Sequence, residues 1–123
     1  MILNSTVLQT LLLSQNRDPV IINQHEEASL LIQCDTPAHV SIELLSHTHL
    51  NLYIVDIDFE NSTHEYYWKI KANEHSHLHL FLLQKGVHSS HNTWDTTLFS
   101  HAHLNFNALV NSQKKPRLPT FFT

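Results

Sequence analysis

Histidine is the residue type in this chain most able to do chemistry. The sequence has 12 histidines among 123 residues, and three similar segments carry H-x-H pairs: H-T-H-L-N-L from His47, H-S-H-L-H-L from His75 and H-A-H-L-N-F from His101. Neutral imidazole nitrogens are preferred ligands of Zn²⁺, Ni²⁺, Cu²⁺ and Fe²⁺. The repeated pairs therefore predict a divalent-metal site.

The spacing of the three segments indicates how their histidines are arranged. The segments start 28 (75 − 47) and 26 (101 − 75) residues apart, which corresponds to about two strands with their connections. On a strand, the two imidazoles of an H-x-H pair point to the same face, which the inward apolar residues between the pairs make the outer one. If such segments stack as neighbouring strands ~4.8 Å apart, their histidines form columns. An ordinary solvated strand face that tolerates His as it tolerates Asn or Thr is the alternative. The predicted metal ligands are His47, His49, His75, His77, His79, His101 and His103.

Alternating apolar residues predict the elements that position these histidines. A small residue followed by apolar residues at every second position is typical of strands with one buried face, whereas helices need apolar spacings of three and four. The chain is therefore predicted to be all-β. The clear series are 28–34, 38–44, 48–54, 76–82 and 102–110, and weaker copies are 66–70 and 94–98.

The regular recurrence of these series predicts a right-handed parallel β-helix, or solenoid, of about three to four coils with two strands each. Gly86 is the only glycine in the sequence, which fits wide corners better than glycine-containing hairpins. We expect the segments from His47, His75 and His101 to be parallel neighbours in one sheet. An antiparallel β-sandwich is the structural alternative. One domain is expected over 1–123, with an N-terminal cap at 1–18 and an extended tail at 113–123.

Composition excludes several classes of protein. The net charge of −4 argues against nucleic-acid binding, and one glycine excludes glycine-rich phosphate loops. A single cysteine, Cys34, excludes an internal disulfide and a cluster held by this chain's thiolates alone. The sequence has neither a long apolar span nor a signal peptide, so we expect a cytoplasmic protein without membrane contact.

Other reactive side chains have ordinary interpretations. Cys34 ends an inward series and is interpreted as a small core residue. Asp56, Asp58 and Glu60 alternate at the end of another series, which we interpret as a solvated edge or corner. The chain contains no nucleophile elbow, so no catalytic residue is assigned and a non-enzymatic role is expected.

Part of the chain resembles the β-helix core of the SufB/SufD family, the scaffold subunits of iron–sulfur cluster assembly. The resemblance covers 19–112 in pattern, and its specific part is an aromatic strand over 65–70, an alternating strand over 77–83, a turn over 84–87 and then Ser90-His91-Asn92. Ser90 departs from the family, which usually has a basic residue there. The family's C-terminal half, with its cluster-handling cysteine and histidine, has no counterpart in these residues.

The resemblance implies a SufD-like, non-catalytic component of iron–sulfur cluster assembly that acts by protein–protein contact. We expect a homodimer or a complex with a SufB/SufD-like partner, and through it an assembly ATPase complex. The second hypothesis is a small His-rich β protein that binds a divalent metal. The third is a cupin-like metalloenzyme, although no Glu follows His77 and His79 within the next turn, as a cupin requires.

Overall fold

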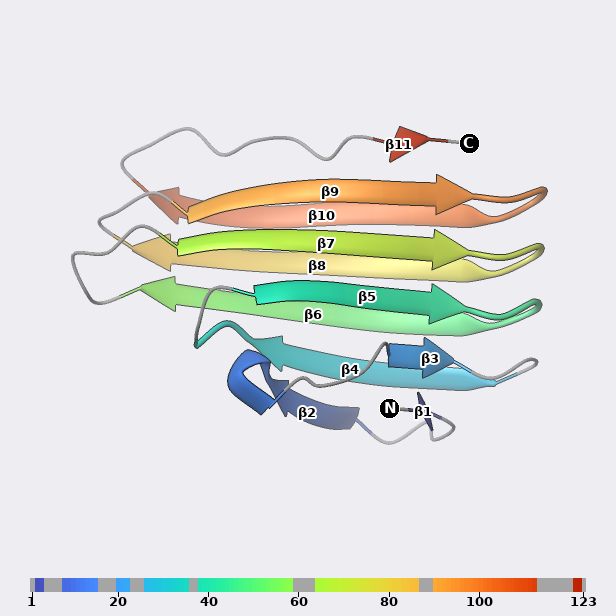
Figure 1. The fold of residues 1–123 in the computed structure, drawn as a ribbon, viewed down its shortest axis with the longest axis horizontal. Coiled ribbons are helices and arrows are strands. Elements are labelled where there is room, and N and C mark those ends of the chain that lie inside the picture. The colour runs from blue at the N-terminus through green and yellow to red at the C-terminus, as the bar shows by residue number, and fades with distance from the viewer. Residues whose placement is uncertain are drawn as a thin grey trace.

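Two parallel sheets built from alternate strands form the protein (Figure 1). The computed structural model describes residues 2–3, 8–15, 20–22, 26–35, 38–58, 64–86, 90–112 and 121–122. In spatial order, sheet A consists of β1 (Ile2–Leu3), β3 (Val20–Ile22), β5 (Ala38–Leu44), β7 (His64–Ala72), β9 (Ser90–Leu98) and β11 (Phe121–Phe122). Sheet B consists of β10 (His103–Ser112), β8 (His77–Gly86), β6 (His49–Asp58), β4 (Glu27–Gln33) and β2 (Leu8–Leu12), the last followed by the 3-10 turn η1 (Leu13–Gln15).

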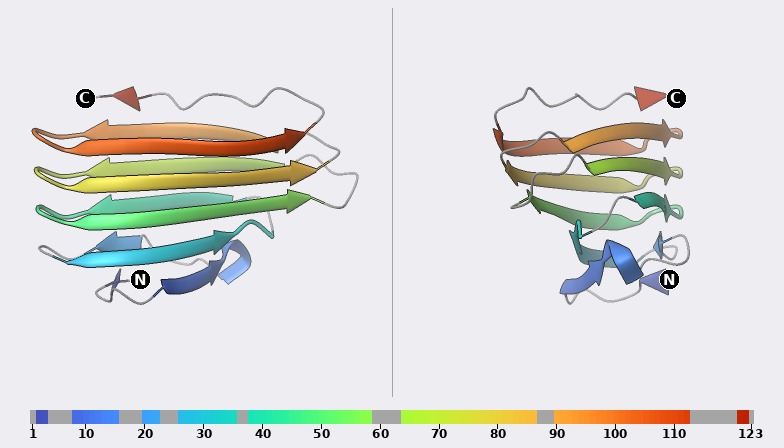
Figure 2. Two further views of the ribbon diagram at one scale, coloured as in Figure 1. Left: turned by 180° about the vertical axis from the view of Figure 1, so that it is seen from behind. Right: turned by 60° about the vertical axis from the view of Figure 1, so that its left-hand side comes forward.

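The chain winds through these sheets as a right-handed parallel β-helix. Sheet A strands run left to right at the front of Figure 1, sheet B strands return behind them, and each pair lies above the one before; Figure 2 shows the same winding from behind. Every hydrogen-bonded pair of strands among the described residues is parallel, which rules out the antiparallel sandwich. Along the chain, each strand of sheet A is followed by a strand of sheet B, and the successive strands from β1 to β10 make about four to five coils. This is more than the three to four coils predicted, because β1–β3 extend the stack at the N-terminal end.

The predicted alternation sets which side chains lie between the sheets. The registers place β6 on β8 with Leu50 opposite Leu78 and Leu52 opposite Leu80, all at most 1% exposed. Like residues therefore stack coil upon coil, and each coil packs against its neighbours to form one continuous core. Inward-facing residues of the central coils are Val40, Ile42, Leu44, Leu50, Leu52, Ile54, Tyr66, Trp68, Ile70, Leu78, Leu80, Leu82 and Trp94.

Two of the sequence-based interpretations change in the structure. Asp56 is buried, not solvated: it continues the inward series of β6, and its Oδ1 accepts a hydrogen bond from the Tyr66 hydroxyl at 3.3 Å. Residues 84–86 belong to β8 and not to a turn, because Gly86 still pairs with Ser112 of β10. The side chain of Asp58, Glu60 and residues 113–120 lie outside the described residues.

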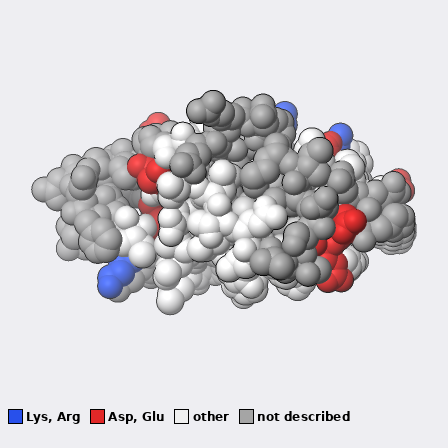
Figure 3. All heavy atoms as spheres, turned by 90° about the horizontal axis from the view of Figure 1, so that it is seen from below, with Lys and Arg blue, Asp and Glu red and all other residues white. Residues whose placement is uncertain are grey.

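Charged side chains lie mainly toward the periphery. Figure 3 views the stack from its N-terminal end, where the middle is uncharged or not described and acidic groups lie at either side. Among the described residues, the structure contains no helix with the length and apolar character to cross a membrane.

Short corners join sheet A to sheet B, and a histidine occupies the same position in three of them. His47, His75 and His101 have φ of 60°, 59° and 59°, the left-handed region that usually favours glycine. Of residues with a Cβ, Asn, Asp and His are the most tolerant of this conformation. Histidine thus serves at three corners whose backbone conformation usually favours glycine.

Hydrogen bonds between coils continue around the corners. The amide of Asn73 donates to the carbonyl of Leu44 at 3.0 Å, and the amide of Phe99 donates to the carbonyl of Ala72 at 3.0 Å. Within the corners, the hydroxyls of Thr48 and Ser76 donate to carbonyls three residues earlier, at 2.8 and 2.6 Å. Thr48 and Ser76, the small residues that begin the series over 48–54 and 76–82, are therefore buried corner residues.

We expect His75→Val to lower the free energy of unfolding by about 1–2 kcal/mol, because a β-branched residue is strained at positive φ. His75→Asn, which tolerates the same conformation, should stay within about 0.5 kcal/mol of the parent protein. Urea denaturation of both variants measures the difference. Equal losses in the two variants would instead assign the effect to the imidazole's ring contacts.

Candidate functional site

Six of the seven predicted metal ligands form two columns of stacked imidazoles along one side of the β-helix. The strand column consists of His49, His77 and His103, which begin β6, β8 and β10 and pair directly in register. Their ring centroids are 4.6 and 4.8 Å apart, with interplanar angles of 4° and 15°. The spacing is that of neighbouring strands, so the sheet itself sets the contact between the rings.

The corner column consists of His47, His75 and His101. Its ring centroids are 4.9 Å apart at both steps, with interplanar angles of 7° and 11°. These residues belong to the corners and not to the strands, so the prediction that each H-x-H pair shares one strand face is wrong for His47/His49, His75/His77 and His101/His103. Positive φ at the first histidine of each pair breaks the alternation of the strand.

His79 is the seventh predicted ligand, and it shares the outer face of β8 with His77. Its register neighbours are Asn51 on β6 and Asn105 on β10. Asn105 Nδ2 lies 3.4 Å from His79 Nδ1. β8 is therefore the strand on which two histidines, His77 and His79, lie on one face within regular β-structure.

As placed, the rings stack face to face. Among the described residues, no three His, Cys, Asp or Glu side chains converge on a point where an ion would lie. Cys34 takes no part in such a site, because it is buried and its burial strongly raises the pKa of the thiol. The structure contains the predicted histidine columns, and metal binding by these columns stays a prediction.

The surroundings of His77, the central imidazole of the strand column, lower its pKa. Burial lowers the pKa of His77 below its ordinary value of 6.5, and the positive charges of His49, His103, His79 and His75 lower it further. His77 is thus biased toward the neutral form, which is the form that ligates metals.

An apolar groove lies on the same outer face of sheet B, over the middle of β6, β8 and β10. Its volume is about 710 Å³. Tyr53 and Phe81 stack across adjacent coils with ring centroids 5.1 Å apart, and Leu109 and Leu83 beside them are 68% and 37% exposed. The lining residues are Leu8, Ser29, Leu31, Tyr53, Ile54, Val55, Phe81, Leu82, Leu83, Asn107, Ala108 and Leu109.

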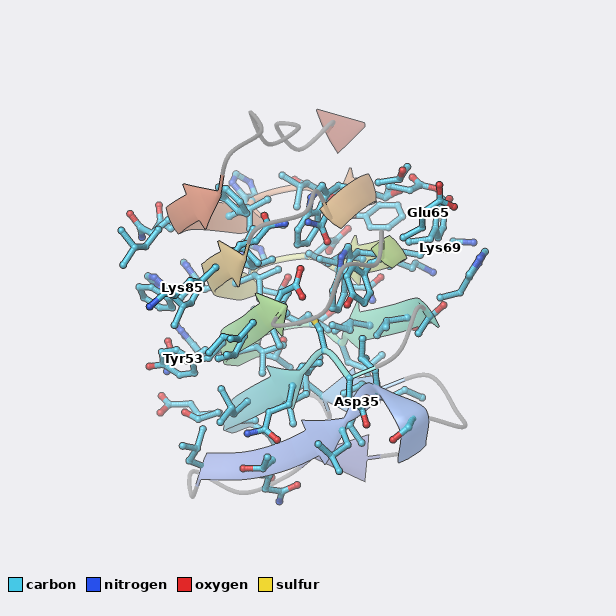
Figure 4. All side chains as sticks on the ribbon, turned by 90° about the vertical axis from the view of Figure 1, so that its left-hand side faces the viewer. Asp35, Tyr53, Glu65, Lys69 and Lys85 are labelled. Carbon is cyan, nitrogen blue, oxygen red and sulfur yellow. The ribbon has the colours of Figure 1, made fainter. Side chains whose placement is uncertain are left out.

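The outer face of sheet A differs sharply from this surface. Its exposed positions include Glu65 and Lys69, which project from the side opposite Tyr53 and Lys85 in Figure 4. Tyr67 on the same face donates its hydroxyl to Asp95 Oδ2 at 3.0 Å. One outer face is thus polar and hydrogen-bonded, and the other presents aromatic and aliphatic side chains to water.

The groove was not predicted from the sequence, although the hydropathy pattern contains a signal for it. The period-2 pattern breaks at runs of three or four consecutive apolar residues, which include 52–55, 80–83 and 108–110. These runs begin 28 (80 − 52) and 28 (108 − 80) residues apart, close to the length of a coil. Strands that are apolar on both faces in register indicate a covered outer surface.

The fold and this surface define the class of protein: a small right-handed parallel β-helix with a histidine-lined edge and one apolar outer face. No known protein family, curated protein or solved structure matches the chain.

Proposed function

We propose that this protein is a non-catalytic, SufD-like component of iron–sulfur cluster assembly that works in the cytoplasm by protein–protein contact. The observation that carries the contact role is the exposed apolar groove on sheet B. The link to iron–sulfur assembly rests on the resemblance of 19–112 to the SufB/SufD β-helix core, and the β-helix architecture is consistent with that resemblance.

The asymmetry of the two outer faces supports contact with a protein. Leu8, Tyr53, Ile57, Leu83 and Leu109 are each at least 37% exposed, and all lie on strands of sheet B. Contiguous exposed apolar surface of this kind marks interaction sites, because it gains about 25 cal/mol per Å² when it is covered.

The occupant we assign to the groove is a SufB/SufD-like partner subunit with an uncharged, aliphatic surface. The side chains lining the groove are all uncharged, so they offer no ion pairs to an acidic or basic peptide. Among the described side chains of sheet B, Glu27 and Lys85 carry charge at its margins, and they lie at opposite ends of the strands. An apolar centre with a polar margin is the usual arrangement of a protein interface.

Analytical ultracentrifugation at micromolar concentration, with and without a purified SufB-type subunit, tests the proposal. The parent chain should form a complex, and Leu83→Asp should weaken it by at least about tenfold, because burial of an unpaired carboxylate costs more than the ~1.4 kcal/mol that a tenfold change represents. Ser41→Asp, which adds the same charge to the exposed outer face of β5, is the matched control and should bind like the parent.

A parent chain that binds no SufB-type subunit would overturn the assignment to iron–sulfur assembly. Self-association that Leu83→Asp abolishes would identify a second copy as the occupant of the groove. Equal binding by Leu83→Asp and Ser41→Asp would show that the partner docks elsewhere.

The second candidate function is binding of a divalent metal ion, and the stacked histidine columns favour it. The cupin-like alternative is not carried forward, because cupins are antiparallel jelly rolls whereas all strand pairs in the described part of this chain are parallel.

A further inference from the structure

We propose that His77 and His79, together with one flanking histidine, His49 or His103, form a three-histidine site for Zn²⁺ on the outer face of β8. This site rests on the second candidate function, metal binding, and is independent of the groove. It replaces the seven predicted ligands with a specific set of three.

The stacked rings of the strand column limit how two of its histidines can share an ion. Two nitrogens that share a Zn²⁺ ion at ~2.0–2.1 Å each are at most about 4.2 Å apart. The ring centroids of the strand column are 4.6 and 4.8 Å apart with the rings nearly parallel, and among the described residues no three His, Cys, Asp or Glu side chains converge on an ion position in this arrangement. One ring must tilt, and rotation is open to His49 and His103, whose side chains are exposed.

The backbone positions suit three ligands around one ion. His77 and His79 lie two residues apart on one strand face, a separation of about 6.6 Å, and the flanking strands lie about 4.8 Å away. Imidazoles at three corners of such a triangle can lean toward its centre. β6 and β10 lack this arrangement, because Asn51 and Asn105 occupy the register of His79.

The donor set selects the metal. Three neutral nitrogens without a carboxylate suit Zn²⁺ and its late first-row neighbours and not Mg²⁺ or Ca²⁺, whose ligands are oxygens. Three protein ligands leave a fourth position of the zinc tetrahedron open to water or to another molecule. Glu27 pairs with His49 in register on the far side from His77, so it lies beyond this triangle.

The geometry also predicts redundancy. β8 has a histidine on each side, His49 on β6 and His103 on β10, both in direct register with His77. Loss of either one leaves a complete set of three, whereas loss of both leaves two ligands. No such replacement exists for His79.

Competition of the metal-free protein with a chromophoric Zn²⁺ chelator at pH 7.5 tests the site. The parent should bind one ion, and His79→Asn should bind at least about 100-fold more weakly, beyond the 10–100-fold cost of losing an outer-shell partner. Asn already stands at this register in both neighbouring strands, so His79→Asn should keep the fold. His39→Asn, an exposed histidine on sheet A, controls for loss of one imidazole. Circular dichroism checks the fold of each variant.

The flanking variants complete the test. His49→Asn and His103→Asn should each retain binding within about tenfold of the parent, and the double variant should lose it to the extent of His79→Asn. Parent-like binding by His79→Asn would overturn this site, and it would show that another set of histidines, such as the corner column, binds the metal. A parent chain that binds no Zn²⁺ would overturn both the site and the second candidate function.

Discussion

Trp68→Ala should lower the free energy of unfolding by about 3–5 kcal/mol, the range for deleting a large aromatic side chain from a core. Trp68 is completely buried in β7 at the centre of the stack. Its ring stacks on Trp94 of the next coil at 5.4 Å, and its Nε1 donates to Asn92 Oδ1 at 2.9 Å. The substitution therefore leaves a cavity in the core, and it also leaves the buried Asn92 oxygen without this donor.

Two further variants separate these contributions. Trp68→Phe keeps most of the stacking surface but removes the N–H donor, so its loss should be smaller than that of Trp68→Ala. Lys69→Ala, the adjacent residue on the exposed face, should change stability by less than about 0.5 kcal/mol. Urea denaturation measures all three. A loss under about 1 kcal/mol for Trp68→Ala would contradict the stacking of β7 on β9.

Acid should destabilise the metal-free protein through the strand column. Burial and the neighbouring imidazoles hold the pKa of His77 below 6.5, so the unfolded chain binds this proton more readily than the folded one. Its contribution to stability is therefore fully present above pH ~6.5 and is lost as the pH falls through the folded pKa. Protonated rings stacked on each other also repel across the strands.

Thermal melts in EDTA between pH 8 and pH 5 measure this effect. The melting temperature of the parent should fall with acidification, by about 4 °C for each kcal/mol lost. The triple variant His49→Asn, His77→Asn and His103→Asn should show a flatter dependence of melting temperature on pH. A parallel decline in both proteins would assign acid sensitivity to other groups, and proton NMR titration of the His77 ring would then show an ordinary pKa.

Most of the fold was predictable from local patterns. Alternation over 48–54 and 76–82 predicts both the strands and their inward residues, because each side chain of a strand points to the opposite face from its neighbours. The repeated H-x-H segments, 28 and 26 residues apart, indicate parallel stacking, and β6, β8 and β10 pair in that way. The number of coils was underestimated because the short strands β1–β3 carry too few residues to show a periodic pattern.

The candidate site was predicted only in part. The sequence indicates the two histidine columns, but it treats His47 and His49 as neighbours on one face. Positive φ at His47 places its ring at the corner instead, and no periodicity reports a single residue's φ. Asp56 was interpreted as solvated because it is acidic, yet the alternation of β6 carries it inward, where the Tyr66 hydroxyl contacts it.

By itself, the sequence determines which side of the clearly alternating strands faces the core, because successive side chains of a regular strand point to opposite faces. It also determines that similar segments recur at the length of a coil. Only the tertiary structure decides what those segments make together on the outside. Tyr53 and Phe81 are 28 residues apart in the chain, and parallel pairing of β6 with β8 brings their rings to 5.1 Å. The groove is a product of this register, and so is the proposed three-histidine site, since each is built from side chains of different coils.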